Sequence, residues 1–521
     1  MPQGCPIGAL GEALGTEAHT VAGSVVDPAL VVLGVTLDSR TVAAGDLYAA
    51  LPGAHVHGAR FAAPAQGSGA VAVLTDEAGL RMLRDDGCTL PTFVVSSPRG
   101  VLGQAAASVY GTNRPQRGGQ AMTLFGVTGT NGKTTTTYLL DSALRAAGRT
   151  TGLVGTVETR VAGERVPSVR TTPEAPDMHR LLAVMRERGV QACSMEVSSQ
   201  ALAQHRVDGI VVDVAGFTSF SQDHLELHGD MATYLAAKAM LFTPQRSRQA
   251  VVVVDDEGGA EIARRATVPV VTLSGRPDAD ADWVVATRTP DRTGTDFVLR
   301  PTQGAAGADE LELRCPLVGD FNVMNTALAA VMLLQSGMSP ALVTRGLRRA
   351  GGVPGRMEQV GAAGPGMPLA VVDYAHTPVA VAAALAALRP ATHGRLVVVL
   401  GAGGDRDPSK REAMGAAAAA TADVVIVTDD NPRSEDPAAI RSVVLAGARG
   451  TARTSAADVL EVADRAEAIR RAVATAGAGD VLLIAGKGHE QGQEVAGQVH
   501  PFDDRDQLRA ALAAHRAAVR P

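Results

Sequence analysis

The segment 124–136 carries the residues with the clearest chemical use. An apolar run over 122–127 leads into a loop that ends in Gly132, Lys133 and Thr134 and opens a helical pattern. Backbone N–H groups at such a loop and helix start bind phosphate oxygens, and the helix dipole favours the anion. The lysine reaches the outer phosphates, and the threonine hydroxyl suits Mg²⁺. A glycine-rich turn without a ligand is the alternative, but it requires neither the strand nor the helix, so we predict a triphosphate site.

Carboxylate and imidazole side chains follow two further apolar runs of the same region. Glu196 comes after the run 191–195, where a carboxylate near a phosphate loop is placed to hold Mg²⁺. The alternative is a helix N-cap cluster in which Ser198 or Ser199 is the cap. His224 lies in an Asp/His/Glu-rich segment whose spacing differs from that of zinc peptidases, so a role beside a magnesium nucleotide fits better.

Lys238 has apolar neighbours at helical spacing, so we expect its amine to be partly buried. Burial of a lysine lowers its pKa and makes the amine reactive. The alternative is a lysine on a helix surface whose amine extends to water.

Three polar clusters follow apolar runs in the last third of the chain, at 403–407, 429–433 and 486–490. Each alone is compatible with a turn, because Gly, Asp, Asn and Pro are turn residues. Strand ends of a parallel sheet meet at one edge, so together these clusters predict a binding site. Arg406 and Arg433 suit a carboxylate and Glu490 suits an ammonium group, which indicates a zwitterionic ligand.

The elements that must position these residues are short apolar runs alternating with helical patterns. This alternation predicts parallel sheets covered by helices. The predicted strands are 31–37, 70–74, 92–95, 122–127, 153–157, 191–197, 211–217, 250–254, 369–373, 395–400, 424–428 and 480–485, and a helix is predicted over 411–421.

The expected fold class is α/β with three domains, because the length of 521 residues suggests about three. A linker-like segment at 111–119 and a glycine-rich one at 351–355 separate them. We predict an N-terminal domain over 1–112, a central P-loop domain of mostly parallel sheet over 120–350, and a smaller C-terminal Rossmann-like domain over 353–521.

Composition excludes several classes of protein. The chain is 46% hydrophobic and 20% charged, which is typical of a globular protein, and its net charge of −6 gives no footprint for nucleic acid. Four scattered cysteines indicate neither a disulfide framework nor a zinc ribbon. No signal-peptide pattern or membrane-spanning run occurs, so we expect a cytoplasmic protein without membrane insertion.

These motifs, in this order, resemble the Mur ligase family over nearly the whole chain. The resemblance assigns UDP-sugar binding to the N-terminal domain, and it matches the family's UDP–muramoyl-dipeptide contacts at Leu37, Ser39, Thr171, Thr172, Ser198, Gln204 and Arg206. Its nucleotide contacts fall on Gly129, Thr130, Asn131, Gly132, Lys133, Thr134, Thr135, Asn322, Arg356, Asp373 and His376. The family's contacts to diaminopimelate fall on Arg406, Asp430, Asn431, Pro432, Arg433, Gly486 and Glu490.

The resemblance implies an ATP-dependent ligase of peptidoglycan precursor synthesis in the cytoplasm. It would add 2,6-diaminopimelate to UDP-MurNAc-L-Ala-D-Glu through an acyl phosphate, and a monomer is expected. The implied catalytic residues are Lys133, Glu196, His224 and Lys238, the last as a carbamate. The implied Mg²⁺ ligands are Thr134, Glu196, His224 and Lys238.

The chain departs from the family pattern at Gln200, Ser219, Gln222 and Ala402. One alternative is therefore a related ligase of a secondary-metabolite pathway with a different carboxylate substrate. A nucleotide-gated scaffold without catalysis and a folate-type polyglutamate ligase are two further alternatives.

Overall fold

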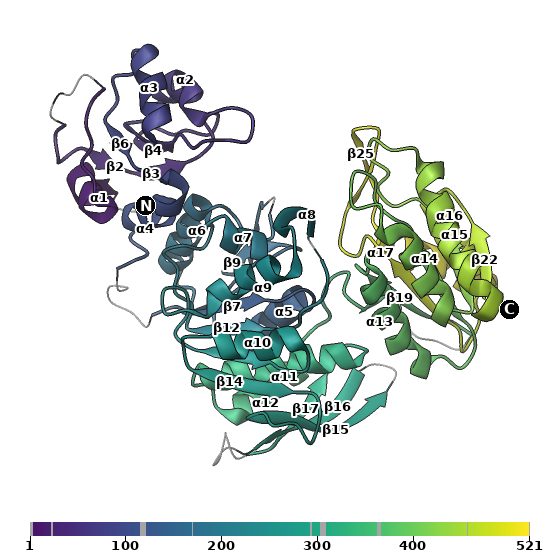
Figure 1. Cartoon of the computed structure of the whole chain (residues 1–521). Coiled ribbons are helices and arrows are strands. Elements are labelled where there is room, and N and C mark those ends of the chain that lie inside the picture. Colours follow the sequence, from purple (N-terminus) through teal and green to yellow (C-terminus); the bar gives the residue numbers. More distant parts are fainter. Residues whose placement is uncertain are drawn as a thin grey trace. The chain divides into compact units, whose positions relative to one another are not determined.

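The computed structural model describes most of the chain (Figure 1). The described residues are 4–21, 24, 26–114, 121–168, 170–223, 225–291, 294–302, 309–361, 366–455 and 457–519. They divide into two compact units. The first unit consists of 1–284, 301–308 and 328–346, and the second of 285–300, 309–327 and 347–521. No described helix is long and apolar enough to cross a membrane.

The N-terminal part of the first unit is built on a four-stranded parallel sheet. Its order is β3 (Gly34–Thr36), β4 (Asp46–Ala49), β5 (Ala72–Thr75) and β6 (Thr92–Val94). Apolar clusters lie on both faces, one of them beneath α1 (Ile7–Leu14) and α4 (Pro98–Val109). A two-stranded pair, β1 (Cys5–Pro6) with β2 (Val31–Val32), and the helices α2 (Ala62–Gly67) and α3 (Glu77–Asp85) complete this part.

The phosphate loop belongs to a larger sheet in the first unit. Its parallel strands are, in spatial order, β8 (Thr151–Val154), β11 (Ala192–Glu196), β7 (Thr123–Thr128), β12 (Val214–Phe217), β13 (Ala250–Val253), β14 (Val270–Ser274) and β15 (Trp283–Asp291). β9 (Thr159–Val161) and β10 (Glu164–Val166) extend it as antiparallel strands beside β8. Parallel strands place their carboxyl ends at one edge, so the loops after β7, β8, β11 and β12 share that edge.

Helices cover both faces of this sheet. On one face, apolar side chains of α6 (Ala175–Glu187), α7 (Ser199–Ala203), α9 (Met231–Ala239) and α10 (Glu257–Arg265) pack against alternate residues of the strands. On the other face lies α5 (Lys133–Ala146), where Ser194 of β11 donates a hydrogen bond to the Thr137 carbonyl over 3.0 Å. The further helices are α8 (Leu225–His228), α11 (Asp320–Gln335) and α12 (Pro340–Arg348).

The second unit contains a six-stranded sheet. Its order is β18 (Glu358–Gln359), β19 (Leu369–Asp373), β23 (Val481–Ala485), β20 (Leu396–Leu400), β21 (Val424–Val427) and β22 (Asp458–Glu461). All but the short edge strand β18 run parallel. Two antiparallel pairs also belong largely to this unit, β16 (Gly294–Pro301) with β17 (Leu311–Cys315), and β24 (Gly492–Val495) with β25 (Gln498–Pro501).

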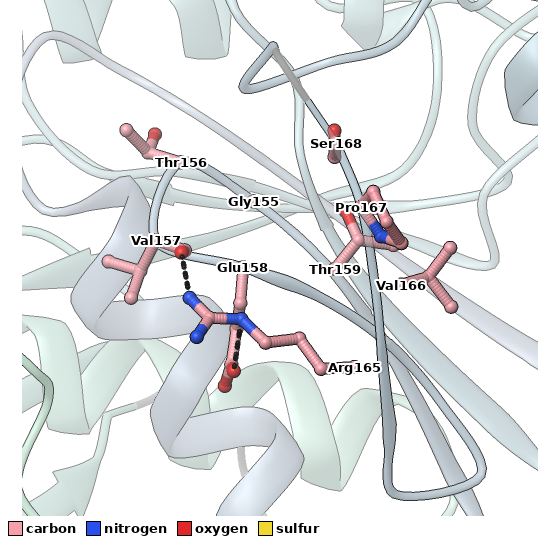
Figure 2. Close-up of a pocket in the computed structure, with 9 residues that line it drawn as sticks. All are labelled: Gly155, Thr156, Val157, Glu158, Thr159, Arg165, Val166, Pro167 and Ser168. Carbon is pink, nitrogen blue, oxygen red and sulfur yellow. Dashed lines mark hydrogen bonds and ion pairs between the residues drawn. The ribbon is translucent and has the colours of Figure 1, made fainter. Parts of the chain in front are cut away.

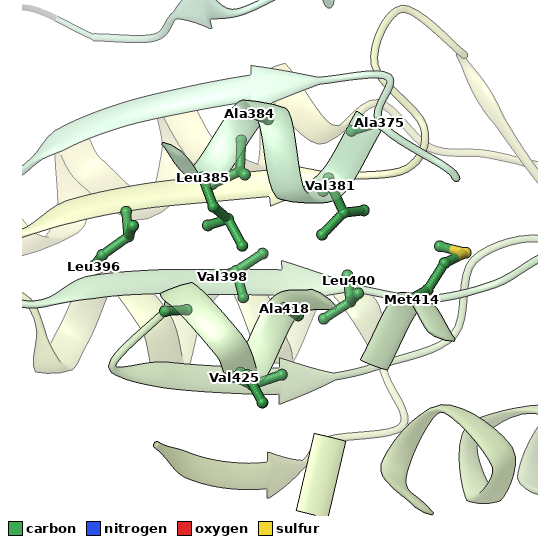
Figure 3. Close-up of a cluster of buried hydrophobic side chains, with 14 of the residues drawn as sticks. Ala375, Val381, Ala384, Leu385, Leu396, Val398, Leu400, Met414, Ala418 and Val425 are labelled. Atoms are coloured by element: carbon green, nitrogen blue, oxygen red, sulfur yellow. The ribbon is translucent and has the colours of Figure 1, made fainter. Parts of the chain in front are cut away.

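Two apolar layers enclose the six-stranded sheet. Val398 and Leu400 of β20 face the layer formed by α13 (Pro378–Leu388), α14 (Lys410–Thr421) and α15 (Pro437–Ser455) (Figure 3). Val397 and Val399 face the opposite layer, formed by α16 (Arg465–Thr475) and α17 (Asp504–Val519). Burial on both faces explains why these strands are continuously apolar runs.

The predicted parallel strands are confirmed, with two differences of consequence. The predicted strand 153–157 ends at Val154, because Gly155 turns the chain and Thr156 donates its N–H to a side chain instead of a neighbouring strand. The predicted run 31–37 is two short strands, β2 and β3. The strands β9, β10 and β15 (Trp283–Asp291) to β17 were not predicted. Most of the linker predicted at 111–119 lies outside the described residues, and the bounds of the three predicted domains stay predictions.

His179 of α6 is a buried neutral histidine that links three parts of the first unit. Its Nε2 donates to the Asp208 carbonyl over 2.9 Å, and its Nδ1 accepts from the Thr112 hydroxyl at 2.5 Å. Burial lowers the pKa of His179 to about 4, assisted by the charge of Arg186.

We expect this histidine to make the protein less stable in mild acid. Between pH 6.5 and about 4 the unfolded chain binds a proton at this residue and the folded chain does not, so stability falls as pH falls. The shift corresponds to roughly 3 kcal/mol over that range. Thermal unfolding of the native protein and of His179→Gln at several pH values measures it. A pH slope identical in both proteins would contradict the assignment.

Candidate functional site

The phosphate loop joins β7 to α5. Gly132 precedes α5 in the left-handed conformation, with φ of 88°, and Gly129 has φ of 143°. A Cβ atom on Gly129 would lie 1.8 Å from the Thr218 hydroxyl oxygen. The loop therefore requires glycine at 129 for two reasons, its backbone conformation and the close approach of the segment after β12.

The segment after β12 holds the loop in place. The Thr130 N–H donates to the Ser219 carbonyl over 2.8 Å, and the Thr130 hydroxyl donates to the Ser221 carbonyl over 3.2 Å. The Lys133 ammonium donates to the carbonyls of Gly129 and Thr130, over 3.0 and 2.8 Å. The loop is thus braced from one side, and its lysine lies across it.

Glu196 lies at the end of β11, beside β7, and is 1% exposed. Its Oε2 accepts from the Thr134 hydroxyl and from the Thr156 hydroxyl, each over 3.0 Å. Its Oε1 accepts from the Thr156 N–H over 2.8 Å. The predicted proximity of Glu196 to the phosphate loop is therefore present. The capping alternative applies to Ser198, whose hydroxyl accepts from the Ala201 N–H at the start of α7.

Lys238 is more buried than expected, with 1% of the residue exposed. Its Nζ donates to the Gly129 carbonyl over 2.7 Å and lies 4.4 Å from the centre of the Tyr234 ring. Burial, reinforced by the charge of Lys133, lowers the pKa of Lys238 well below its ordinary value. Burial thus favours the neutral form of this amine, which is the nucleophile towards CO₂ or another electrophile.

Most of the residues predicted for the UDP–muramoyl dipeptide lie around Glu174. Arg206 pairs with Glu174 over 3.0 Å and donates to the Gln204 side chain over 2.6 Å. The Thr172 hydroxyl donates to the Glu196 main-chain carbonyl over 2.8 Å. The structure thus brings together, in the first unit, Thr171, Thr172, Ser198, Gln204 and Arg206. Leu37 and Ser39 follow β3 in the N-terminal part of that unit.

The second unit holds the remaining predicted nucleotide residues. Asp373 ends β19 and accepts from the Met357 and Ala375 N–H groups, over 2.7 and 2.8 Å. Burial raises the pKa of Asp373, and the charge of Arg356 opposes that rise. The Arg356 guanidinium lies 4.3 Å from the centre of the Tyr374 ring, and the His376 ring lies 4.6 Å from it. Asn322 is buried at the start of α11, where its amide donates to the Val318 carbonyl.

The predicted amino-acid site is assembled from the loops after β21 and β23. The Asn431 amide donates to Glu490 over 2.9 Å. The fully buried Lys487 ammonium donates to the Asn431 carbonyl oxygen over 2.8 Å and lies 3.4 Å from Glu490. Arg433 has the left-handed φ of 54°, pairs with Glu494 over 3.2 Å and donates to the Gly404 carbonyl.

Gly486 and Arg406 complete this cluster. Gly486 has φ of 119°, and a Cβ there would lie 2.4 Å from the Asp430 carboxylate. The loop after β23 can therefore approach the loop after β21 this closely only with glycine at position 486. Arg406 lies on the exposed loop after β20, and a Cβ on Gly403 would lie within 4 Å of both Arg406 and Arg433. The predicted amino-acid residues are therefore neighbours in space, including Asp430 and Pro432.

The donors beside the phosphate loop suit a hard cation. Thr134, Thr156 and Glu196 offer only oxygen atoms, which is the preference of Mg²⁺. Within the described ranges, no group of three or more His, Cys, Asp or Glu side chains is arranged to hold a metal. The predicted ligand His224 lies outside the described residues, so its part in metal binding stays a prediction.

A pocket of about 350 Å³ lies beside this site, between the loop after β8 and strand β10 (Figure 2). Arg165 crosses it, donating to the Val157 carbonyl over 3.2 Å and approaching Glu158 at 3.6 Å. None of the predicted site residues lines this pocket. A second pocket, of about 330 Å³, lies in the second unit between β19 and α17, and none of the predicted site residues lines it either.

Two residues of these clusters were missed from the sequence. Thr156 was placed inside the predicted strand 153–157. The glycine before it could have indicated that the strand ends there and that Thr156 lies in a loop at the strand end. Lys487 stands between two glycines in the predicted cluster 486–490, where it was assigned no role, and it is fully buried. With Lys133 and Lys238, it is one of only four lysines in a chain with 48 lysine and arginine residues.

A parallel sheet with a phosphate loop at its carboxyl edge, and a second α/β unit with paired cationic and anionic side chains, define a nucleoside-triphosphate-dependent enzyme. Comparison with known proteins identifies its family. The Mur ligase family catalytic domain matches residues 31–110, the Mur ligase middle domain 127–333, and the Mur ligase glutamate ligase domain 355–488. The chain belongs to the Mur ligase family and is an ATP-dependent ligase.

Relatives are similar over almost their whole length. The UDP-N-acetylmuramoyl-L-alanyl-D-glutamate–2,6-diaminopimelate ligase of Streptomyces coelicolor is 49% identical over 507 residues, covering 97% of this chain and 96% of the relative. The enzyme of that name from Streptomyces avermitilis is 51% identical over 484 residues, covering 92% of each chain. A solved structure of a ligase of that name is 31% identical, with a TM-score of 0.67, and covers 95% of this chain and 98% of its own.

Proposed function

We propose that this enzyme adds 2,6-diaminopimelate to the D-Glu carboxylate of UDP-MurNAc-L-Ala-D-Glu, with conversion of ATP to ADP and phosphate. The observation that carries the proposal is the cluster of Asn431, Arg433, Lys487 and Glu490, which offers charges for a zwitterion. The full-length similarity to ligases named for this reaction supports it.

The first chemical step forms an acyl phosphate. A carboxylate oxygen of D-Glu attacks the γ-phosphorus of ATP, and the bond to ADP breaks. Lys133 neutralises the charge on the transferring phosphoryl group, and the backbone N–H groups at the start of α5 hold the phosphates. We assign Thr134, Glu196, His224 and a carbamylated Lys238 to the binding of Mg²⁺, which would supply further charge neutralisation.

The second step forms the amide. The amine nitrogen of diaminopimelate attacks the acyl carbon, a tetrahedral intermediate forms, and phosphate leaves as the nitrogen loses a proton. Arg406 and Arg433 are assigned to a carboxylate of the amino acid and Glu490 to its distant ammonium group. Asn431, Asp430, Pro432 and Gly486 shape the space between them.

The departures from the family pattern leave the phosphate loop intact. Ser219 braces the loop through its main-chain carbonyl, which accepts from the Thr130 N–H, and its hydroxyl lies 3.4 Å from the backbone N and O of Asn131. Gln222 is exposed. These positions therefore give no specific support to the alternative of a secondary-metabolite ligase.

An amino-acid panel tests the proposal. Purified protein with ATP, Mg²⁺ and UDP-MurNAc-L-Ala-D-Glu is offered meso-diaminopimelate, LL-diaminopimelate, lysine or ornithine, and phosphate release is measured. We expect release with a diaminopimelate isomer well above that with lysine. Absence of release with either isomer would refute the proposal, and release only with another carboxylate substrate would favour the pathway alternative.

Replacing Arg433 with alanine should raise the KM for diaminopimelate far more than the KM for ATP. The charge-assisted pair that is lost corresponds to roughly 1.5–3 kcal/mol, or about 10- to 100-fold in KM. Arg433→Lys should give an intermediate value, because it keeps the charge and loses the planar fork. Steady-state kinetics with each substrate varied measures this effect, and an unchanged amino-acid KM would contradict the role.

A further inference from the structure

Thr156 connects the phosphate loop to the residues assigned to the muramoyl dipeptide. Its hydroxyl lies 3.0 Å from Glu196 Oε2, the atom that also accepts from the Thr134 hydroxyl at the start of α5. The same hydroxyl lies 3.0 Å from the hydroxyl of Thr171. One side chain therefore contacts both the carboxylate beside the phosphate loop and a residue of the predicted muramoyl-dipeptide site.

The Glu196 carboxylate decides which of the neighbouring threonine hydroxyls donates and which accepts in this hydrogen-bond network. Glu196 as a carboxylate only accepts, so the hydroxyls of Thr134 and Thr156 both donate to it. The Thr156 oxygen then has lone pairs left, and the Thr171 hydroxyl donates to it. Each member of the chain fixes the orientation of the next.

The backbone at this place is arranged for close approach. A Cβ on Gly155 would lie 2.5 Å from Glu196 Oε1, so a glycine is needed for the loop after β8 to reach the carboxylate. The Thr156 N–H donates to that same oxygen over 2.8 Å. Thr156 therefore holds both oxygens of a carboxylate that is 1% exposed.

We propose that Thr156 is a positioning residue of this ligase, which aligns the Glu196 carboxylate with the phosphate loop and with Thr171. This inference rests on the proposed function. Without the hydroxyl, Glu196 loses one of its side-chain donors and Thr171 loses its acceptor. The carboxylate then has more than one orientation, which slows phosphoryl transfer without removing a contact to ATP or the amino acid.

Three variants test the proposal. Thr156→Val keeps the shape of the side chain and removes the hydroxyl, whereas Thr156→Ser keeps the hydroxyl. Thr159→Val is the matched control, because the buried Thr159 hydroxyl lies three residues away and has no hydrogen-bond partner among the described residues. We expect Thr156→Val to lower kcat about 10- to 100-fold, the range for a lost hydrogen bond to a charged group. The KM values for ATP and diaminopimelate should stay near native, Thr156→Ser should recover most of the rate, and Thr159→Val should be native.

A binding measurement separates this inference from the proposed substrate. ADP affinity is measured by calorimetry with and without Mg²⁺, and we expect Thr156→Val to show a smaller Mg²⁺-dependent gain than the native protein and Thr159→Val. Native kcat and a native Mg²⁺-dependent gain in Thr156→Val would overturn the inference alone. A native protein inactive on the whole amino-acid panel would overturn the proposed function, and the ADP measurement would still decide whether Thr156 positions Glu196.

In the kinetic experiment, equal losses of rate in Thr156→Ser and Thr156→Val would also overturn the inference about Thr156.

Discussion

Lys133→Ala is expected to lower kcat by about 10²–10³-fold or more, the effect of removing a single electrostatic contact to a developing charge. The Lys133 amine lies across the phosphate loop, within 3.0 Å of two of its carbonyl oxygens. The only other lysine of the first unit is Lys238, so no further lysine is available to replace it. Phosphate release at saturating ATP measures the loss.

The control for this variant is Lys410→Ala, because Lys410 begins α14 in the second unit, outside every cluster described above. It should have native kinetics. Turnover by Lys133→Ala close to the native rate would contradict phosphoryl transfer at this loop. A native protein that binds ATP and shows no turnover would instead favour the scaffold alternative.

Lys238→Ala is expected to reduce kcat about 100-fold or more, because it removes a group buried against the loop that carries the transferred phosphate. Burial lowers the pKa of Lys238, which favours the neutral amine, and only the neutral amine adds CO₂. The carbamate would place an anion able to bind Mg²⁺ beside the phosphate loop.

Depletion of CO₂ tests the carbamate separately from the lysine. We expect the native enzyme to lose activity in CO₂-free buffer and to recover it when bicarbonate is added, with no such response in Lys238→Ala. Lys238→Arg should stay inactive, because a guanidinium does not form the carbamate. Native activity that is indifferent to bicarbonate would contradict the modification and leave the lysine as an unmodified structural residue.

Much of the fold follows from local sequence, because parallel strands buried on both faces are apolar throughout. The runs 122–127, 369–373 and 424–428 differ from the observed strands β7, β19 and β21 by a residue or less at each end. The strands β9, β10 and β15 were not predicted, because polar residues interrupt their apolar pattern. The arrangement of strands across a sheet depends on contacts between distant segments, which single runs do not encode.

The candidate site was predictable where function requires unusual residues at strand ends. Glu196 and Asn431 were found in this way, because ligands of parallel sheets bind at the carboxyl ends of the strands. Glu196 lies at the end of β11, and Asn431 lies in the loop after β21. Thr156 was missed because an error of a few residues in a strand boundary moved it from a loop into a sheet. Lys487 was missed because burial is a property of tertiary packing, and a charged residue between glycines is usually at the surface.

The scarcity of lysine has a practical consequence for spectroscopy. Almost all of the 48 lysine and arginine residues are arginine, and lysine occurs only at positions 133, 238, 410 and 487. Side-chain isotope labelling of lysine would therefore give four amine resonances, three of them from residues of the two clusters. A single labelled sample could follow nucleotide binding, carbamate formation and amino-acid binding as three separate signals.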